Sequence, residues 1–269
     1  MSGATAEVHR LISIGPSHFC EKARWALERA YIAFTEDKHA PGTHIPYTRG
    51  LPGGTSCPKL LIGKGPARVV IGKGSSEILE FADKKITKEE DRLYPSDPEQ
   101  RQLVQSWVTK FDDQLGPHVR RFAYCYLMFV PSTYELLTQG SSTPEKVVVW
   151  FMMPLLRRLI YRGLGCNKPG NKEKSLQVID SMFKEVDDVL ADGRPYICGS
   201  KFTAADLTFA ALGGPMVAPP QSGTWSVPLD ECPSELATAM KRLQVTPAGQ
   251  HILKTYETKR RRPEEKRIY

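Results

Sequence analysis

The 269-residue sequence lacks an apolar run long enough to cross a bilayer, since its most apolar stretch, residues 147–156, is short and contains Pro154. Its first residues, 1–6, lack the basic segment and apolar stretch of a secretory signal or transit peptide. The histidines and cysteines lack the paired short spacing of a zinc site, and the glycine-rich segments 63–65 and 72–74 lack the spacing of a nucleotide-binding loop. These absences predict a cytoplasmic protein with no membrane span, metal or nucleotide site.

Cysteine is also sparse, and the six cysteines do not form the framework of a small disulfide-rich domain. We expect reduced thiols, mostly packed as small apolar side chains. The net charge of +7 comes from dispersed basic residues, except for the cluster at 259–262. Two glutamates follow that cluster at once, so the prediction is a solvated tail and no nucleic-acid partner, with nucleic-acid or membrane attraction as the alternatives. The apolar stretch 147–156 is expected to be buried or to face a partner.

The first 88 residues alternate between the periodicities of strands and helices, which is typical of an α/β unit. Strands are expected at 8–14, 32–36, 59–62 and 68–71, helices at 19–30 and 75–85, and an irregular connection at 39–56. The order of these elements predicts a thioredoxin-like domain over residues 1–88.

Beyond a charged, proline-containing linker at 87–98, the strand pattern disappears. Helical periodicity covers residues 100–129, with a bend expected at Gly116-Pro117, and returns at 175–191. Residues 139–173 have no clear pattern. The predicted fold class is therefore an α/β thioredoxin-like domain followed by an all-α helical domain over residues 97–269.

Residues 15–27, which read GPSHFCEKARWAL, resemble the first strand-to-helix turn of the glutathione transferase superfamily. The resemblance gives Ser17 the role of the serine whose hydroxyl donates a hydrogen bond to the glutathione sulfur. Cys20 lies at the second cysteine position of a thioredoxin-style pair and implies thiol transfer instead. His18 is expected to be a surface or packing residue. The position in the turn favours Ser17 as the catalytic residue, with Cys20 as the alternative.

Two further segments resemble the glutathione site of that superfamily. Cys57-Pro58 precedes the predicted hairpin and matches the cis-proline position, where the backbone pairs with the cysteinyl part of glutathione. Ser75 and Ser76 open the next helix and match the motif that binds the γ-glutamyl carboxylate. The acidic residue that precedes the serine in the family is replaced here by Gly74, which removes one partner for the ligand's amino group.

The second domain adds a structural match and three candidate substrate residues. Residues 199–207, which read GSKFTAADL, resemble the capping box that the family carries on a buried helix. Thr203 is the cap residue, and the side chain of Asp206 is expected to bond the backbone amide of Thr203. The resemblance places Arg120, Arg121 and Tyr124 at the acceptor site, although a charged face beside a buried aromatic one explains them equally. The paired acids at 112–113 are expected to be solvated.

The resemblance implies a detoxification enzyme, a glutathione transferase that uses Ser17 to activate glutathione, its co-substrate, for conjugation to apolar electrophiles or reduction of hydroperoxides. It also implies a homodimer. Two alternatives stay open: a Cys20-dependent thiol transferase or glutathionyl reductase, and a non-catalytic protein of the same fold that binds apolar ligands or mediates assembly.

Overall fold

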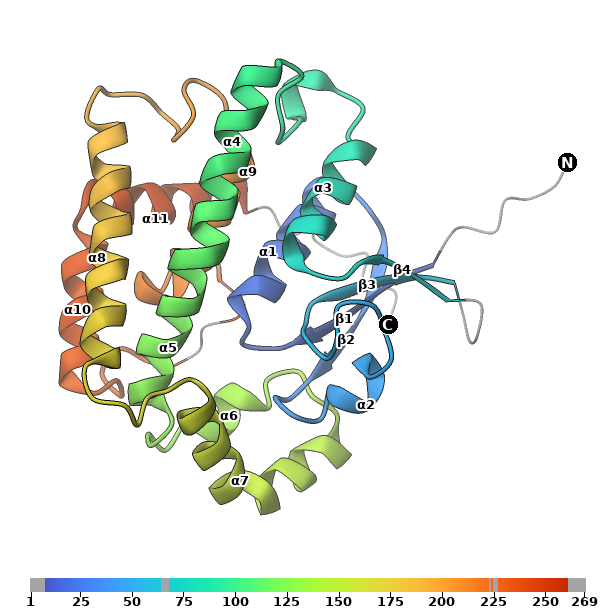
Figure 1. Cartoon of the computed structure of the whole chain (residues 1–269), viewed down its shortest axis with the longest axis vertical. Helices are drawn as coiled ribbons and strands as arrows, with labels where there is room; N and C mark the ends of the chain where they lie inside the picture. The colour runs from blue at the N-terminus through green and yellow to red at the C-terminus, as the bar shows by residue number, and fades with distance from the viewer. Residues whose placement is uncertain (1–7, 64–67, 223, 225–226, 261–269) are drawn as a thin grey trace, which may run out of the picture.

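The computed structural model (Figure 1) describes residues 8–63, 68–222, 224 and 227–260. Its amino-terminal part contains β1 (His9–Ile14), α1 (His18–Arg29), β2 (Phe34–His39), α2 (Ile45–Thr48), β3 (Lys59–Ile62), β4 (Val69–Gly72) and α3 (Ser75–Lys85). The strand order is β2-β1-β3-β4, with β1 parallel to β2 and antiparallel to β3, and β3 antiparallel to β4. This confirms the thioredoxin-like arrangement.

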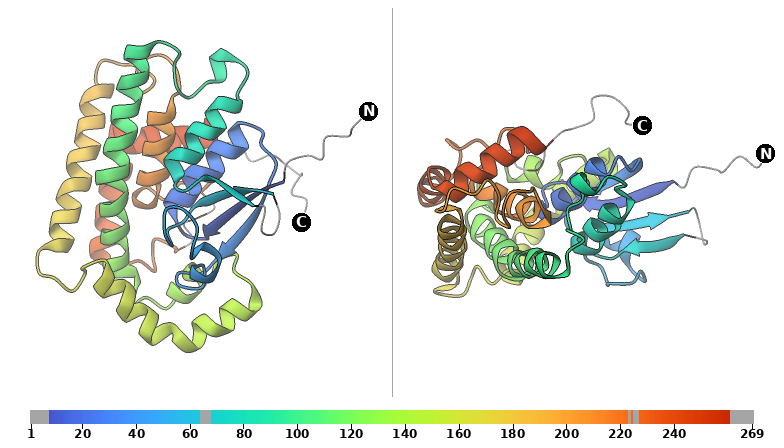
Figure 2. Two further views of the ribbon diagram at one scale, coloured as in Figure 1. Left: turned by 45° about the vertical axis from the view of Figure 1, so that its right-hand side comes forward. Right: turned by 90° about the horizontal axis from the view of Figure 1, so that it is seen from above.

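The rest of the described chain is helical. It contains η2 (Glu89–Asp91), α4 (Pro98–Lys110), η3 (Phe111–Leu115), α5 (Gly116–Leu127), α6 (Thr133–Leu137), α7 (Thr143–Gly163), α8 (Asn171–Leu190), α9 (Ala204–Gly213), η4 (Gly214–Met216), α10 (Ser234–Gln244) and α11 (Pro247–Lys259). The helical bundle stands beside the sheet, and α1 packs against both α3 and α9, so one core continues through both parts (Figures 1 and 2). The predicted fold class is confirmed, while the domain limits at 88 and 97 stay a prediction.

The buried helix α9 begins with the predicted capping box. Thr203 is its cap, and the carboxylate of Asp206 accepts a hydrogen bond from the Thr203 amide at 2.9 Å. Asp206 also accepts from the Ile197 amide and from Nε2 of His251, at 2.9 and 3.0 Å. A single buried carboxylate thus joins the start of α9 to the preceding loop and to α11.

The long helix is divided near Gly116, as predicted, by one π-helical turn, η3, between α4 and α5. Gly116 lies where α1 and α9 cross this helix. A β-carbon at position 116 would stand 2.5 Å from the ring of Phe19 and 3.2 Å from Leu212, so a larger residue there would require the Phe19 ring to shift.

Residues 139–173, which showed no pattern, contain the 21-residue helix α7. Its inner edge, which includes Val149 and Met153, packs on a small second core with Ala40, Met128 and Leu137. Its outer face is exposed, with Trp150 at 62% and Phe151 at 70%. The expectation of burial for 147–156 therefore holds for the inner edge alone.

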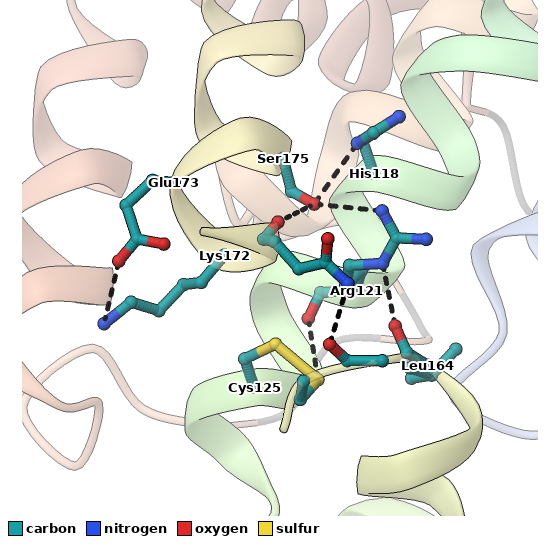
Figure 3. The surroundings of a disulfide bond; sticks show 10 residues. His118, Arg121, Cys125, Leu164, Lys172, Glu173 and Ser175 are labelled. Atoms are coloured by element: carbon teal, nitrogen blue, oxygen red, sulfur yellow. Dashed lines mark hydrogen bonds and ion pairs between the residues drawn. A yellow bond between two sulfur atoms is a disulfide. The ribbon is translucent and has the colours of Figure 1, made fainter. Parts of the chain in front are cut away.

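Two expectations from composition are wrong in part, since four of the six cysteines are free thiols as expected. Cys125 at the end of α5 and Cys166 after α7 form a disulfide with a Cα–Cα distance of 5.2 Å (Figure 3). The pairing is hidden in the sequence because 41 positions separate the two cysteines. Arg260, expected in a solvated tail, is buried and pairs with Glu21 and Glu28, and residues 261 and 262 lie outside the described residues.

Candidate functional site

The turn between β1 and α1 ends at Ser17, the cap residue of α1. The Ser17 amide donates to the carbonyl oxygen of Ile14 at 3.1 Å, which closes the turn, and its hydroxyl accepts from the Cys20 amide at 3.4 Å. The side chain is half-buried. Its oxygen therefore stands at the positive end of a helix while it remains partly open to solvent.

Cys20 is closed off from solvent, with an exposed fraction of 0%. Its sulfur accepts a hydrogen bond from the Ile14 amide at 3.4 Å. Burial raises the pKa of the Cys20 thiol, although the nearby charge of Arg24 acts in the opposite direction. Cys20 is a neutral, enclosed thiol in this structure, which is the state of a packing cysteine.

The turn is held from two sides. Nη2 of Arg24 donates to the Gly15 carbonyl oxygen at 3.2 Å, and Arg24 also pairs with Glu21 and Glu36. On the other side, a β-carbon at Gly15 would lie 2.1 Å from the carbonyl oxygen of Gln139, so the connection between α6 and α7 packs directly on the turn.

The Cys57–Pro58 peptide bond is cis, as the sequence predicts. It immediately precedes β3, the neighbour of β1 in the sheet. The Cys57 thiol is half-buried and interacts electrostatically with Cys20, and burial raises its pKa. The sheet thus brings the cis-proline loop beside the Ser17 turn.

The third segment, at the start of α3, contains an interaction that sequence reasoning missed. Nζ of Lys22, which is fully buried, donates to Ser76 Oγ at 2.8 Å and to the two carboxylate oxygens of Asp112 at 2.8 and 2.9 Å. Ser76 also donates to Asp112. Ser75 is buried beside them, after the extended cap residue Gly74.

Asp112 was expected to be solvated, and this is wrong because it neutralises Lys22 across the interface between the two parts of the chain. A signal was present in the sequence. Lys22 lies three residues after Phe19 and four before Ala26, so it shares one face of the helix with these apolar residues. A charged residue on such a face requires a partner.

Helix α5 divides the three predicted substrate residues between two sides. Arg120 interacts electrostatically with His18 and with Tyr124, and Tyr124 in turn with Cys20. Burial raises the pKa of Tyr124 to about 12, so its hydroxyl stays protonated. Arg121 lies elsewhere: its Nε donates to the Leu164 carbonyl oxygen at 2.8 Å, beside the disulfide (Figure 3).

Among the described residues, no group of three or more potential ligand side chains could hold a metal ion. None of the described helices has both the length and the apolar character needed to span a bilayer.

The comparisons with known proteins agree with this fold. The sequence pattern of the family described as "Glutathione S-transferase, C-terminal domain" matches residues 169–232. A glutathione transferase from Burkholderia graminis, solved with two glutathione molecules per subunit, superposes with a TM-score of 0.61 at 16% identity, covering 97% of this chain and 87% of its own. The chain has the glutathione transferase fold.

Two further solved structures are similar to this chain at comparable sequence identity. Beta-etherase LigF from Sphingobium sp. strain SYK-6 has a TM-score of 0.58 at 17% identity, with 92% of this chain and 99% of LigF covered. FzlA from C. crescentus has a TM-score of 0.53 at 17% identity, with 91% and 92% covered. Curated protein sequences give no significant match.

Within the glutathione transferase fold, the predicted site residues therefore separate into two groups. Ser17, Cys20, the cis bond at Cys57 and the start of α3 lie around α1, and Arg120 and Tyr124 approach that helix from α5. Arg121 belongs to the disulfide region instead.

Proposed function

We propose that the chain is a glutathione-dependent transferase in which Ser17 stabilises the thiolate of bound glutathione. The observation that carries this proposal is the contrast between the partly open hydroxyl of Ser17 and the fully enclosed sulfur of Cys20. A hydroxyl at the first turn of α1 donates a hydrogen bond to a sulfur anion, and the helix dipole adds to the stabilisation. Both effects lower the pKa of the glutathione thiol from its usual value of about 8.5.

The remaining contacts of the tripeptide are assigned to backbone and serine groups. The backbone of Cys57, beside the cis-proline, pairs with the cysteinyl part, and the start of α3 with Ser75 and Ser76 binds the γ-glutamyl carboxylate. Asp112 stands next to Ser76, but its charge is paired with Lys22, so at Gly74 one partner for the ligand's amino group stays absent. Bound glutathione in the Burkholderia graminis transferase supports this choice of co-substrate.

The thiolate then attacks an apolar electrophile or a hydroperoxide. The likeness to a beta-etherase favours ether cleavage as a specific form of this reaction, in which the sulfur bonds to carbon and the alkoxide leaves. Arg120 and Tyr124 are the candidates for contacting the acceptor. The resemblance to the family also makes a homodimer part of the proposal, and the molar mass in solution tests it.

Substitution of Ser17 and Cys20 separates the serine mechanism from thiol transfer. We expect Ser17→Ala to lower kcat/KM for a conjugation substrate by about 100-fold, comparable to the loss of one preorganised hydrogen-bond donor. Cys20→Ala should retain activity within about threefold, because its sulfur is enclosed. Ser106→Ala, at an exposed serine of α4, is the matched control.

The pH profile supplies an independent readout, since loss of the Ser17 hydroxyl should shift the rise of activity toward higher pH. Full activity in Ser17→Ala together with an inactive Cys20→Ala would assign the chemistry to the cysteine. Binding of glutathione in a calorimeter without turnover of conjugation, ether or hydroperoxide substrates would support the non-catalytic alternative.

A further inference from the structure

Helix α7 presents a broad apolar face to solvent. Seven large apolar side chains of this helix are between 46% and 70% exposed: Val147, Val148, Trp150, Phe151, Met152, Leu155 and Leu159. Phe129, 63% exposed, extends the face through a ring contact with Tyr161. So much contiguous exposed apolar surface indicates an interaction site.

The face belongs to a firmly anchored helix. At the amino-terminal end, Ser142 and Glu145 form a capping box, and Glu145 Oε1 lies 2.7 Å from Nδ1 of His39. At the other end, the carbonyl oxygen of Leu164 accepts from Arg121, and the disulfide joins Cys166 to α5 (Figure 3). The inner edge of α7 is buried between these two anchors, so its exposed apolar side chains are not the result of a detached segment.

The exposed charged side chains of this helix are all basic. Lys146, Arg158 and Arg162 are exposed, and Arg157 is half-buried with no hydrogen-bond partner for its Nε. The one acid within α7, Glu145, is already engaged by His39 and by the Ser142 amide. Exposed cations of α7 therefore accompany its exposed apolar side chains, in a chain whose net charge is +7.

The position of α7 leaves its outer side accessible to a partner. Helix α7 forms one end of the molecule, away from α8 to α11, and its outer side projects from the body (Figures 1 and 2). A hollow of about 430 Å³ beside it is lined by Tyr134, Glu135, Trp150, Met153, Pro154 and Arg157. A protruding helix with exposed aromatic rings can enter the headgroup layer of a bilayer.

We propose that α7 docks the protein onto anionic membrane surfaces. Trp150, Phe151 and their apolar neighbours enter the interfacial region, while the arginines extend toward lipid phosphates. The helix lies parallel to the surface because its inner edge stays on the protein core. A second copy is a poorer occupant, since a symmetric contact between two α7 faces brings together two surfaces that both carry exposed basic residues and no exposed acid of α7. The proposal is independent of the chemistry at Ser17.

Vesicle flotation of the full chain tests the proposal, with vesicles of phosphatidylcholine alone or with about one-third phosphatidylserine. We expect wild type to float with the anionic vesicles and at least fivefold less with the neutral ones. The double variant Trp150→Ser/Phe151→Ser should lose at least tenfold of the binding. Arg158→Glu/Arg162→Glu should lose a similar amount, because each basic residue near an anionic surface contributes about fivefold.

The matched controls are Tyr31→Ser, at a tyrosine that is 87% exposed in the amino-terminal part, and Lys241→Glu on the exposed side of α10. Both should float like wild type. All substituted side chains of α7 are exposed, so the thermal midpoints should stay within a few degrees of wild type. The proposal is overturned if wild type does not float with the anionic vesicles. It is also overturned if both α7 variants float to the same extent as wild type. It is also overturned by a wild-type dimer that does not float and becomes monomeric in Trp150→Ser/Phe151→Ser, which would assign the face to a second copy.

Discussion

His18 follows Ser17 directly and is enclosed between α1 and α5. Its Nε2 lies 3.1 Å from the Gly116 carbonyl oxygen, and since a carbonyl accepts, Nε2 carries the proton and donates. Burial, together with the charge of Arg120, lowers the pKa of His18 to about 3. His18 is thus a neutral hydrogen-bond donor that holds the site helix against α5, which agrees with the expectation of a packing residue.

The lowered pKa of His18 predicts an acid-sensitive free energy of unfolding. Between the unfolded value of 6.5 and the folded value of about 3, the unfolded chain binds one proton more than the folded chain. Stability from this group is complete above pH 6.5 and decreases as the pH falls toward 3, by a total on the order of 5 kcal/mol. In urea titrations from pH 7 to pH 4, wild type should lose more stability than His18→Gln, at about 1.4 kcal/mol per pH unit. Parallel curves for the two proteins would contradict this assignment.

The part of the site that the sequence predicts is the part that local rules and the family resemblance supply. A serine before a helix is a cap wherever the helix begins, and the resemblance implies a cis bond at Cys57–Pro58, so both lie as expected. The partner of Lys22 is 90 positions away and depends on how the two parts pack. No local rule supplies that information.

At the scale of elements, the interface between α1, α3 and η3 depends on the pair of Lys22 and Asp112. Asp112→Asn leaves the buried ammonium group without its counter-charge, and removal of one partner of a buried pair costs about 3 kcal/mol or more. Asp113→Asn, at the exposed neighbouring position, should change the free energy of unfolding by less than about 0.5 kcal/mol. Chemical denaturation measures both values.

The double variant Lys22→Met/Asp112→Leu tests the origin of that loss, since an apolar pair of similar volume can replace a buried ion pair at little cost. We expect it to recover most of the stability that Asp112→Asn loses. A double variant as unstable as Asp112→Asn would show that the contacts of Ser76 with Lys22 and Asp112, and not the charge pairing, hold the interface.

Helix α7 shows why one element escaped prediction. Proline removes a backbone donor, and Pro154 therefore suggested an interruption of the apolar stretch. In the structure α7 continues through Pro154, whose side chain is exposed. Water can satisfy the carbonyl group that loses its partner when it faces solvent, so the helix tolerates proline there. Apolar residues occupy both the buried and the exposed side of α7. The sequence therefore lacks the alternation of apolar and polar residues that identifies an amphipathic helix.

At the scale of the whole molecule, Arg260 joins the end of the described chain to the site helix. Nε of Arg260 lies 2.7 Å from Glu21 Oε1, and Nη1 pairs with Glu28, both on α1. Although burial opposes ionisation of Glu21, Arg260 and Arg24 hold its pKa below the usual value. Arg24 donates hydrogen bonds both to Glu21 and to the Gly15 carbonyl oxygen. An unbroken series of hydrogen bonds therefore connects Arg260, through Glu21 and Arg24, to the turn that contains Ser17.

This continuity predicts that a change at Arg260 reaches the site. Arg260→Met removes one of the two arginines that pair with the buried carboxylate of Glu21. We expect a loss of about 3 kcal/mol in the free energy of unfolding. Lys254→Met removes the same charge from an exposed position of α11 and should be nearly neutral. Hydrogen exchange locates the effect: amides of α1 and of the turn at 15–17 should exchange faster in Arg260→Met, whereas Lys254→Met should leave them unchanged. Faster exchange confined to α11 would contradict this prediction. It would mean that Arg260 stabilises only the end of α11 and that Arg24 alone is enough to hold α1 in place.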